Sequence, residues 1–380
     1  MKLKLPTMLV AGLLVLAACG SGSQAGNTGG GSQAGNTGGG SQAGNPGKNG
    51  KYTIALSNSY IGNKWRVEMV NDFKSTCASP PWNKEVDCSV FNAGNDVSSQ
   101  SQQISNLISK HVDAIVMDAA SPTGLNGVIK QACDRGILMI SFDSVVTAPC
   151  AVTVDTDNTA FGKQLAQFVA DKIHGKGNVI MVTGVAGTAV TEQRQKGAQE
   201  VWDKNPGIKI VAKYPGNWDS ATAQRNTAAQ LPSMPKVVDG IWAEGGTDGI
   251  LKAFIDANRP LPPTAGEAEN GFRKFMSKEG YLGHHVDGLS IGEPPYLSVA
   301  ALQLALDILK GNRPKAGLHL PFPVVTNATI EVGKTVFPKL EDSFFVSFTD
   351  SGPNAVVTIC EQAALTGAVC PTPPKVNLPK

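Results

Sequence analysis

The chain has 380 residues, 41% of them hydrophobic, and its 33 basic and 31 acidic side chains leave a formal net charge of +2. A chain of this length exceeds what one hydrophobic core usually organises, which favours two lobes. The near-neutral charge argues against nucleic acid as a partner, because proteins that bind nucleic acid carry a clear basic excess. Beyond the N-terminus, no apolar segment is long enough to cross a membrane.

The N-terminus has the order of an export signal. Lys2 and Lys4 precede the apolar run MLVAGLLVLAA, which is shorter than the ~20 residues of a membrane helix. The stretch LAAC, ending at Cys19, resembles the lipobox of bacterial lipoproteins. That resemblance implies attachment of a diacylglycerol to Cys19 and cleavage just before it. Ordinary signal cleavage, with Cys19 as a bystander, is the alternative.

A repetitive segment follows Cys19. The unit SQAGNTGGG occurs at 23–31 and 32–40 and decays to SQAGNPGKN at 41–49. The units contain no large apolar residue, so they have nothing to bury and are predicted to be disordered. A Gly/Ser-rich chain of about thirty residues spans roughly 30 Å. The segment is therefore predicted to be a tether between a lipid anchor and a folded body.

The remaining six cysteines fall into three close sequential pairs. Their spacings are 11, 17 and 10 residues, and an even set in an exported chain favours disulfides. Free buried thiols are the alternative. Zinc is not expected, because the chain has no Cys-x-x-Cys pair or clustered histidines. The predicted bonds are Cys77–Cys88, Cys133–Cys150 and Cys360–Cys370.

Short apolar runs alternate with helical segments from residue 52 onward. Nearly continuous apolar strands are typical of a parallel sheet covered by helices on both faces. The predicted fold class is therefore α/β, with two Rossmann-like lobes of mainly parallel sheets and a boundary near 154–157. The predicted strands are at 52–56, 87–91, 113–117, 137–142, 178–182, 208–214, 238–243 and 288–293. The predicted helices are at 63–76, 97–110, 123–136, 158–174, after Gly187, 219–231, 247–257 and 296–310.

Polar and aromatic residues follow the carboxyl ends of these strands, where open α/β sheets bind ligands. Carboxylates accept paired hydrogen bonds from vicinal hydroxyls, a guanidinium donates a planar pair, and an indole packs on the C–H face of a sugar. The combination predicts a polyhydroxylated ligand. The candidate ligand-binding residues are Ser59, Asn63, Trp65, Arg66, Asp118, Asp143, Arg194, Trp218, Glu244, Glu269 and Glu293, with Glu267 as the alternative to Glu269.

Each candidate also has a purely structural explanation. Trp65 can be a core residue of its helix, Asp143 can cap the following turn, and Arg194 can be a solvated helix charge. The prediction depends on the coincidence of many such residues at strand ends.

The sequence gives little support for an enzyme. His284 and His285 are adjacent and therefore point apart, so they are predicted to be surface residues of a turn rather than metal ligands. The loop GVAGTAV follows a strand but lacks the Gly-Lys-Ser/Thr ending of a P-loop, and no Gly-x-Ser-x-Gly motif occurs. We therefore expect a binding protein with no catalytic residues, cofactor or metal.

Four stretches carry a resemblance to a known family: IALSNSYIGNKWR, MISFDS, GVAGTAVTEQRQKG and LSIGEPPYLSVAALQLALDILKGNRP. From residue 52 to about 326, the chain resembles the ribose/galactose-type periplasmic solute-binding proteins of ABC transporters, which are periplasmic binding proteins of type I. The resemblance implies two lobes joined by three hinge strands, here near 154–157, 291–294 and 321–326. It also implies ligand capture by lobe closure and delivery to a membrane permease.

Matched position by position, the resemblance assigns roles to five of the candidates. Asn63 and Trp65 fall where the family places an amide and an aromatic ring from the first lobe. Asp143 matches a carboxylate, Arg194 a guanidinium, and Trp218 a stacking aromatic of the second lobe.

The chain also departs from the family pattern. Asp118, Glu244 and Glu293 occupy or border positions where the family often has an amide, and GEAENGF replaces the usual Gly-x-Asp turn. Five candidate carboxylates against two arginines make the predicted cleft acidic. Such a cleft binds many hydroxyls, keeps some carboxyls protonated, or receives a cation. A neutral monosaccharide or polyol is the first choice, and an amino sugar or other cationic small molecule is the second.

The predicted organisation follows from these features. The chain is expected to be a monomer, exported and lipid-anchored through Cys19 at the outer face of the cell membrane or in the periplasm. Its partners are a sugar or polyol, the bilayer and an ABC permease, or alternatively a membrane receptor to which it signals. The predicted segments are a signal peptide (1–18), lipidated cysteine and tether (19–50), first lobe (51–155 plus 294–322), second lobe (156–293 plus 323–345) and C-terminal extension (346–380).

Overall fold

The computed structural model describes residues 50–314 and 316–346. The predicted signal peptide, Cys19, nearly all of the tether, and the Cys360–Cys370 bond lie outside the described residues.

The first half of the described chain alternates strands and helices as predicted. Its strands are short and, apart from the half-buried edge strand β2, mostly buried, as expected of a parallel sheet covered by helices on both faces. The elements in order are β1 (Tyr52–Asn58), α1 (Lys64–Ala78), η1 (Trp82–Lys84), β2 (Val86–Asn92), α2 (Val97–Ser109), β3 (Ala114–Asp118), α3 (Asn126–Asp134), β4 (Leu138–Phe142) and β5 (Val152–Asp155).

The second half repeats this alternation and then returns to the first lobe. Its first elements are α4 (Asn158–Lys172), β6 (Lys176–Thr183), α5 (Ala189–Trp202), β7 (Gly207–Pro215), α6 (Ser220–Gln230), η2 (Leu231–Ser233), β8 (Gly240–Ala243) and α7 (Thr247–Asp256). The remaining elements are β9 (Thr264–Glu267), α8 (Asn270–Met276), β10 (Gly288–Ile291), α9 (Leu297–Leu309), β11 (Leu318–His319) and β12 (Val324–Thr326).

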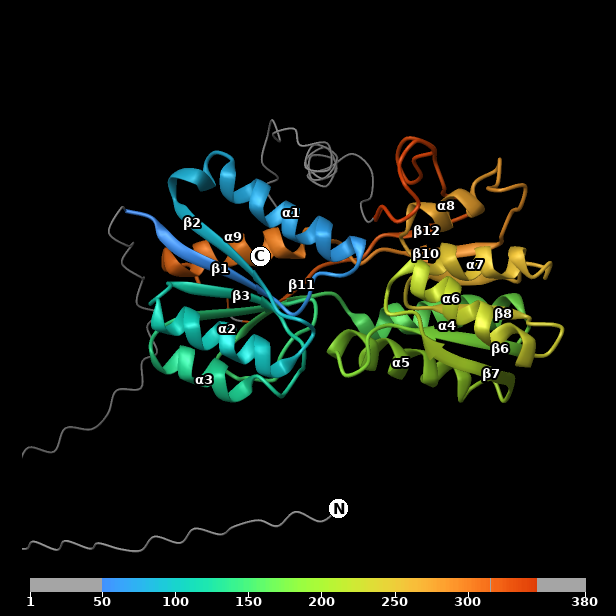
Figure 1. Ribbon diagram of the computed structural model, residues 1–380, viewed down its shortest axis with the longest axis horizontal. Helices are drawn as coiled ribbons and strands as arrows, with labels where there is room; N and C mark the ends of the chain where they lie inside the picture. The colour runs from blue at the N-terminus through green and yellow to red at the C-terminus, as the bar shows by residue number, and fades with distance from the viewer. Residues whose placement is uncertain (1–49, 315, 347–380) are drawn as a thin grey trace, which may run out of the picture. The chain divides into compact units, whose positions relative to one another are not determined.

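Within the described residues, the strands form two six-stranded sheets (Figure 1). The first has the order β11-β5-β4-β3-β1-β2, and its paired strands run parallel. The second has the order β12-β10-β9-β8-β6-β7 and is parallel except for the antiparallel pair of β10 and β12. These sheets confirm the predicted α/β fold class, and we call them, with their covering helices, the first and second lobes.

The chain passes between the two sheets three times: after β5, after β10 and after β11. The second passage returns α9 to the first lobe, where its apolar residues join the core formed by β1, β3, β4 and α1 (Figure 1). A separate apolar core lies in the second lobe, around β8, α7 and α8. The three connections are short segments, which is the arrangement expected of a hinge.

Side-chain caps start several helices beside the strand ends. Asn63 accepts a hydrogen bond from the Arg66 backbone N–H at 2.9 Å at the start of α1. Asp157 and Asp219 cap α4 and α6 in the same way, each at under 3 Å. Each cap satisfies an otherwise unpaired N–H group and fixes where the helix begins. The N-terminal residues of α1 are thereby positioned at the edge of the first sheet.

Two of the three predicted disulfides are confirmed. Cys77–Cys88 joins the end of α1 to β2, and Cys133–Cys150 joins α3 to the segment before β5. Both bonds tie a covering helix of the first lobe to its neighbouring strand or loop.

The structure adds short elements that periodicity did not predict. All seven residues of α8 are buried, the polar ones included, so the helix has no exposed face that would give it a 3.6-residue pattern. Strand β11 has only two residues, which is too short for a pattern of alternation. None of the helices in the described part of the chain is both long and apolar enough to cross a membrane.

Candidate ligand-binding cavity between the lobes

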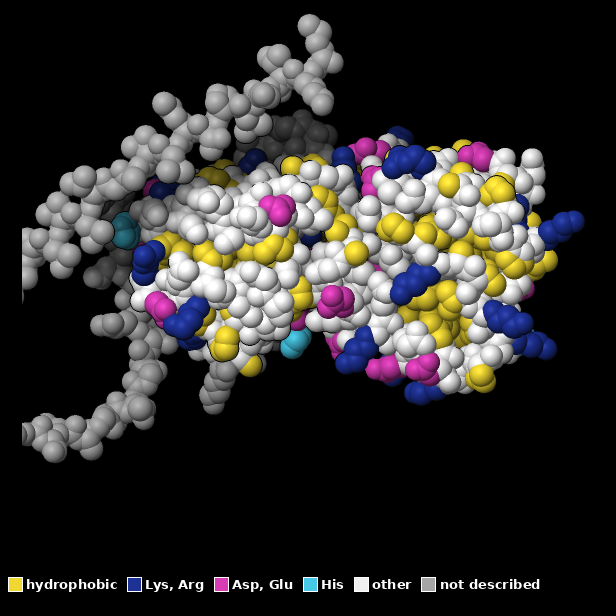
Figure 2. Space-filling model, turned by 60° about the horizontal axis from the view of Figure 1, so that its bottom comes forward, with side chains coloured by type: hydrophobic (Ala, Val, Ile, Leu, Met, Phe, Trp, Pro, Cys, Tyr) yellow, Lys and Arg dark blue, Asp and Glu magenta, His cyan; other side chains and the backbone are white. Residues whose placement is uncertain are grey.

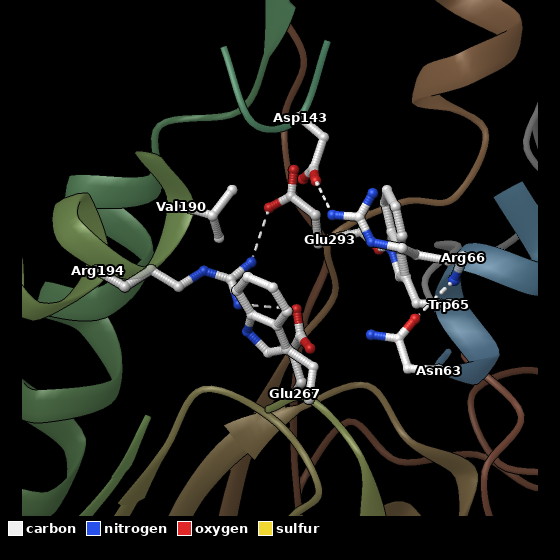
Figure 3. A pocket seen from close by; sticks show the side chains of 9 residues that line it. Asn63, Trp65, Arg66, Asp143, Val190, Arg194, Glu267 and Glu293 are labelled. Carbon is white, nitrogen blue, oxygen red and sulfur yellow. Dashed lines mark hydrogen bonds and ion pairs between the residues drawn. The ribbon is translucent and has the colours of Figure 1, made fainter. Parts of the chain in front are cut away.

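A cavity with about 280 Å³ of atom-free space lies where the strand ends of the two lobes face each other. Every side chain around it is more than nine-tenths buried. The residues that line it are Asn63, Trp65, Arg66, Asp143, Val190, Arg194, Trp218, Glu267 and Glu293 (Figure 3).

The first lobe supplies one side of the cavity from the start of α1 and the end of β4. Asn63 is the N-cap of α1, so Trp65 and Arg66 follow within its first turn. Asp143 comes directly after β4 and has a left-handed backbone with φ of 55°. Such a conformation is costly for a residue with a Cβ and is concentrated at functional sites.

Arg66 is the fully buried centre of this side. Its Nη1 donates to Asn58 Oδ1 at 2.7 Å and pairs with Asp118, while its Nη2 lies 3.9 Å from Asp143 Oδ2. The Tyr60 ring covers one face of the guanidinium, with a centroid distance of 4.4 Å. The guanidinium is thus held on three sides, and its Nη2 edge is turned towards Asp143 and the cavity (Figure 3).

The second lobe contributes Arg194 from α5. Its Nη1 donates to Glu267 Oε1 at 2.9 Å and its Nη2 to Glu293 Oε2 at 3.0 Å (Figure 3). Its Nε donates to Asn158 Oδ1 at 2.8 Å. Glu267 is the last residue of β9, and Glu293 follows β10 on the connection to the first lobe. One arginine therefore orients two carboxyls at neighbouring strand ends.

The Trp218 side chain is closely packed in the second lobe. Asn217 and Trp218 both have left-handed backbones, with φ of 54° and 55°. A Cβ at Gly184 would lie only 2.2 Å from Trp218 Cε2, so the indole packs against the loop after β6 because that position is glycine. The Trp218 Nε1 is buried without a hydrogen-bond partner among the described residues.

Glu293 connects the two sides. Its carboxyl oxygens accept from Thr156 Oγ1 at 2.8 Å, on the connection after β5, and one of them also accepts from Arg194. Its backbone carbonyl accepts from Trp65 Nε1 at 2.8 Å, from the first lobe. A single residue on one crossing segment is therefore bonded to both lobes and to a second crossing segment.

Burial governs the protonation of the cavity carboxyls. Burial raises the pKa of Glu293 to about 7, although Arg194 acts against it. Burial also raises the pKa of Glu267 and of Asp143 above their ordinary values, again opposed by the arginines. Because two arginines face three carboxyls, protonation of one carboxyl makes the cavity close to neutral.

The predicted site residues separate into two groups. Seven of them line the cavity: Asn63, Trp65, Arg66, Asp143, Arg194, Trp218 and Glu293. The other four, Ser59, Asp118, Glu244 and Glu269, are buried but do not line it. Asp118 lies behind Arg66 as its ion-pair partner. Glu269 is the N-cap of α8 and accepts from the Gly246 backbone N–H, whereas Glu267 faces the cavity.

Two residues near the cavity were not among the candidates. Val190 lines it from the first turn of α5, four residues before Arg194 and so on the same face of the helix. That spacing is a signal from which it could have been found. Tyr60 contacts Arg66 from the loop before α1, and no sequence periodicity marks such a loop residue.

The histidine pair lies on the surface, as expected. His284 and His285 are exposed in a turn after Gly283, and the His284 carbonyl pairs with Tyr281 N–H at 2.7 Å. Among the residues that the structure describes, no three metal-binding side chains come together.

Two lobes built on mainly parallel sheets, joined by three connections and with a polar and aromatic cavity between them, define the class of bilobal solute-binding proteins. A family model described as the periplasmic binding protein domain matches residues 54–313. The chain belongs to the periplasmic binding protein domain family, as its sequence motifs indicated. Membership places it outside the cytoplasm. The family consists of binding proteins, and the absence of enzymatic activity in this chain stays a prediction.

Similar proteins agree with this assignment. A xylitol-binding protein of Mycolicibacterium smegmatis is 28% identical over 324 residues, which cover 84% of each chain. The ribose import binding protein of Bacillus subtilis is 24% identical over 287 residues, covering 73% of this chain and 88% of that protein. The crystal structure of an ABC transporter solute-binding protein from Thermobispora bispora is 31% identical, with a TM-score of 0.70, and covers 85% of this chain and 99% of that one.

Proposed function

We propose that the chain captures a monosaccharide or polyol between its lobes and delivers it to the permease of an ABC transporter. The observation that carries this proposal is the cavity itself, in which two indoles, two arginines and three carboxyls from both lobes and a crossing segment surround one small space. The names of similar proteins, which bind xylitol and ribose, support the same ligand class.

The proposed ligand-binding residues are those that line the cavity. The arginine edges donate to ligand hydroxyl oxygens, and ionised carboxylates accept from ligand hydroxyl groups. A protonated carboxyl also donates, so the set recognises hydroxyls in either role. The indoles of Trp65 and Trp218 lie on opposite lobes and cover the C–H faces of the ligand.

Lobe closure gives the ligand its affinity. Residues of the first lobe and the second lobe contact the ligand at once only when the lobes are together, so the ligand binds the closed form better and shifts the population towards it. With one carboxyl protonated, the cavity is close to neutral and favours a neutral ligand over a cationic one, because burial of a cation requires an unpaired carboxylate. The raised pKa of Glu293, about 7 through burial, removes rather than supplies such a charge.

A binding screen tests the ligand class. Xylitol, D-ribose, D-allose and D-glucosamine are added in turn to the purified chain, and the melting temperature is measured. A ligand that binds only the folded protein raises it. We expect xylitol or one of the two neutral sugars to do so, with a heat of binding by calorimetry. A response to D-glucosamine alone contradicts the neutral-ligand proposal, and no response to any sugar or polyol contradicts the proposed function.

Transport is tested in the host. Uptake of the radiolabelled ligand identified by the screen is measured with and without the chain, and we expect uptake to require it. The lipid anchor at Cys19 and the monomeric state are part of the proposal, since both suit a protein that presents its ligand to a membrane permease.

A further inference from the structure

The last described residues, 341–346, run between the two lobes outside the cavity. They have the sequence EDSFFV and follow β12 and a loop of the second lobe. In Figure 1 they form the red end of the coloured chain, beside α8. We call this segment the clasp.

The clasp is anchored to the second lobe. Asp342 accepts from Lys252 Nζ and Lys274 Nζ at 2.8 Å each and from Tyr281 Oη at 3.0 Å. The Asn270 N–H donates to the Phe344 carbonyl at 2.8 Å, and the Val346 N–H donates to Ala268 O at 2.7 Å. These contacts fix the clasp to α7, α8 and the residues that flank α8.

Successive side chains of the clasp pack against different lobes. Phe344 and Val346 are fully buried and pack in a small apolar cluster with Phe337 and Leu340. Phe345 lies between them in sequence and therefore points to the other side, as in an extended strand. It is 2% exposed and belongs to the core of the first lobe, together with residues of α1 and α9.

Two polar contacts near the Phe345 ring also join the clasp to the first lobe. The Phe345 backbone N–H donates to Glu68 Oε1 at 3.1 Å, and Glu68 is fully buried on α1. Glu341 pairs with Lys64, one helical turn before Glu68. Thus the clasp bonds both to α1 of the first lobe and to the β9–α8 segment of the second.

The same two elements carry cavity residues. Trp65 and Arg66 lie on α1, and Glu267 ends β9. Separation of the lobes at the cavity moves α1 away from β9 and so pulls Phe345 out of the core of the first lobe, which exposes a phenylalanine ring to water. Exposure of such a ring to water is unfavourable, because buried apolar surface is returned to solvent.

We propose that residues 341–346 are an interlobe clasp that holds part of the ligand-free population closed. Docking of Phe345 on the first lobe and binding of ligand in the cavity both favour the same closed form, so each strengthens the other. The clasp thereby sets the balance between the open and closed forms independently of any contact with the ligand.

Small-angle X-ray scattering of the ligand-free full chain tests the clasp. All variants carry Cys19→Ser to remove the predicted lipid, so the tether contributes equally to each. Phe345→Ala removes the ring, and Glu341→Lys places like charges against Lys64 without touching the core. The matched controls are Phe91→Ala, a half-buried ring on β2, and Glu331→Lys, whose pair with Lys334 lies within one loop.

We expect both clasp variants to have a larger radius of gyration than the parent, and both controls to match it. Xylitol affinity, measured by calorimetry, falls several-fold in the clasp variants. Equal radii for parent and clasp variants overturn the proposal. If Phe345→Ala does not fold, Glu341→Lys gives the same test, because its side chain is about half exposed. If xylitol does not bind the parent, the proposed ligand class fails, and the scattering comparison still decides the clasp.

Discussion

The two buried arginines shape the chemistry of the cavity in different ways. Arg66 pairs with Asp118 behind it and lies near Asp143 at the cavity, whereas Arg194 pairs with two carboxyls that both line it. A buried guanidinium with a planar set of donors holds such partners in fixed directions. The cavity is therefore preorganised, with few side chains left to be ordered when a ligand arrives.

The two cavity indoles give the most direct test of the site. Trp65→Ala or Trp218→Ala is expected to weaken binding of a confirmed sugar by about tenfold or more, because each removes one face of the ligand sandwich. Calorimetric titration measures the effect. Trp202→Ala is the control, since Trp202 is equally buried in the second lobe but does not line the cavity. Normal affinity in both cavity variants places the ligand elsewhere.

Glu267 and Glu269 are two residues apart, and the structure gives them different surroundings. Glu267→Gln is expected to lower sugar affinity by about tenfold, because it replaces the carboxyl that accepts from Arg194 at the cavity. Glu269→Gln keeps an acceptor for the Gly246 N–H and is expected to leave affinity within about twofold. Titration of both variants with one sugar compares them, and the opposite ranking contradicts the proposed site.

Glu269 also makes stability depend on pH. Burial, followed by the nearby Asp248, raises the pKa of Glu269 to about 7. The Glu269 carboxyl therefore binds its proton more tightly in the folded protein than in the unfolded chain. Its contribution to the free energy of unfolding is complete below about pH 4.5 and is lost as the pH rises through 7. We expect the melting temperature to fall from pH 5 to pH 8, and to fall less steeply in Glu269→Gln. Identical slopes in the two proteins contradict this assignment.

At the level of elements, caps and disulfides hold the cavity-bearing helices in place. Asn63 fixes the start of α1, and Cys77 near its other end is bonded to Cys88 on β2. The helix that carries Trp65 and Arg66 is thus secured at both ends, which limits its freedom to shift against the first sheet.

Loss of the α1 disulfide is expected to destabilise the first lobe. Replacement of Cys77 and Cys88 by serine opens an eleven-residue loop and is expected to lower the free energy of unfolding by about 3 kcal/mol. Urea denaturation followed by circular dichroism measures the change. An unchanged unfolding midpoint contradicts a stabilising role for this bond.

At the level of the whole molecule, charge and connectivity agree with a carrier of small neutral solutes. Basic and acidic side chains are interspersed on the face shown in Figure 2, in keeping with the balanced composition. The three crossings connect the lobes, and in our proposal the clasp does so too. Closure of the lobes then depends on bending of the crossings and on undocking of the clasp.

The predicted lipid anchor at Cys19 determines where the whole molecule is located. Cys19→Ala is expected to move the protein from the membrane fraction to the soluble fraction, because the mature chain then has no acyl group to insert. Labelled palmitate and cell fractionation measure the change, with Ser21→Ala as the control. Membrane association that persists in Cys19→Ala refutes the lipoprotein assignment.

The sequence by itself determined the alternation of strands and helices, two of the disulfides, and the strand ends where seven cavity residues lie. These features are local, since apolar runs, caps and cysteine spacing are set by neighbours in the chain. The sequence left Glu267 and Glu269 undecided, because their roles depend on where β9 ends and α8 begins. Both elements are too short to give a periodic pattern.

The tertiary structure alone decided which polar groups share a cavity and which lie behind it. Asp118 ends β3 and Glu244 follows β8, much as Asp143 follows β4, yet neither is among the residues that line the cavity. It also brought residues 341–346 back between the lobes, where Phe345 reaches Glu68 from 277 positions along the chain. Such contacts form when segments distant in sequence pack together, so the local sequence pattern does not predict them.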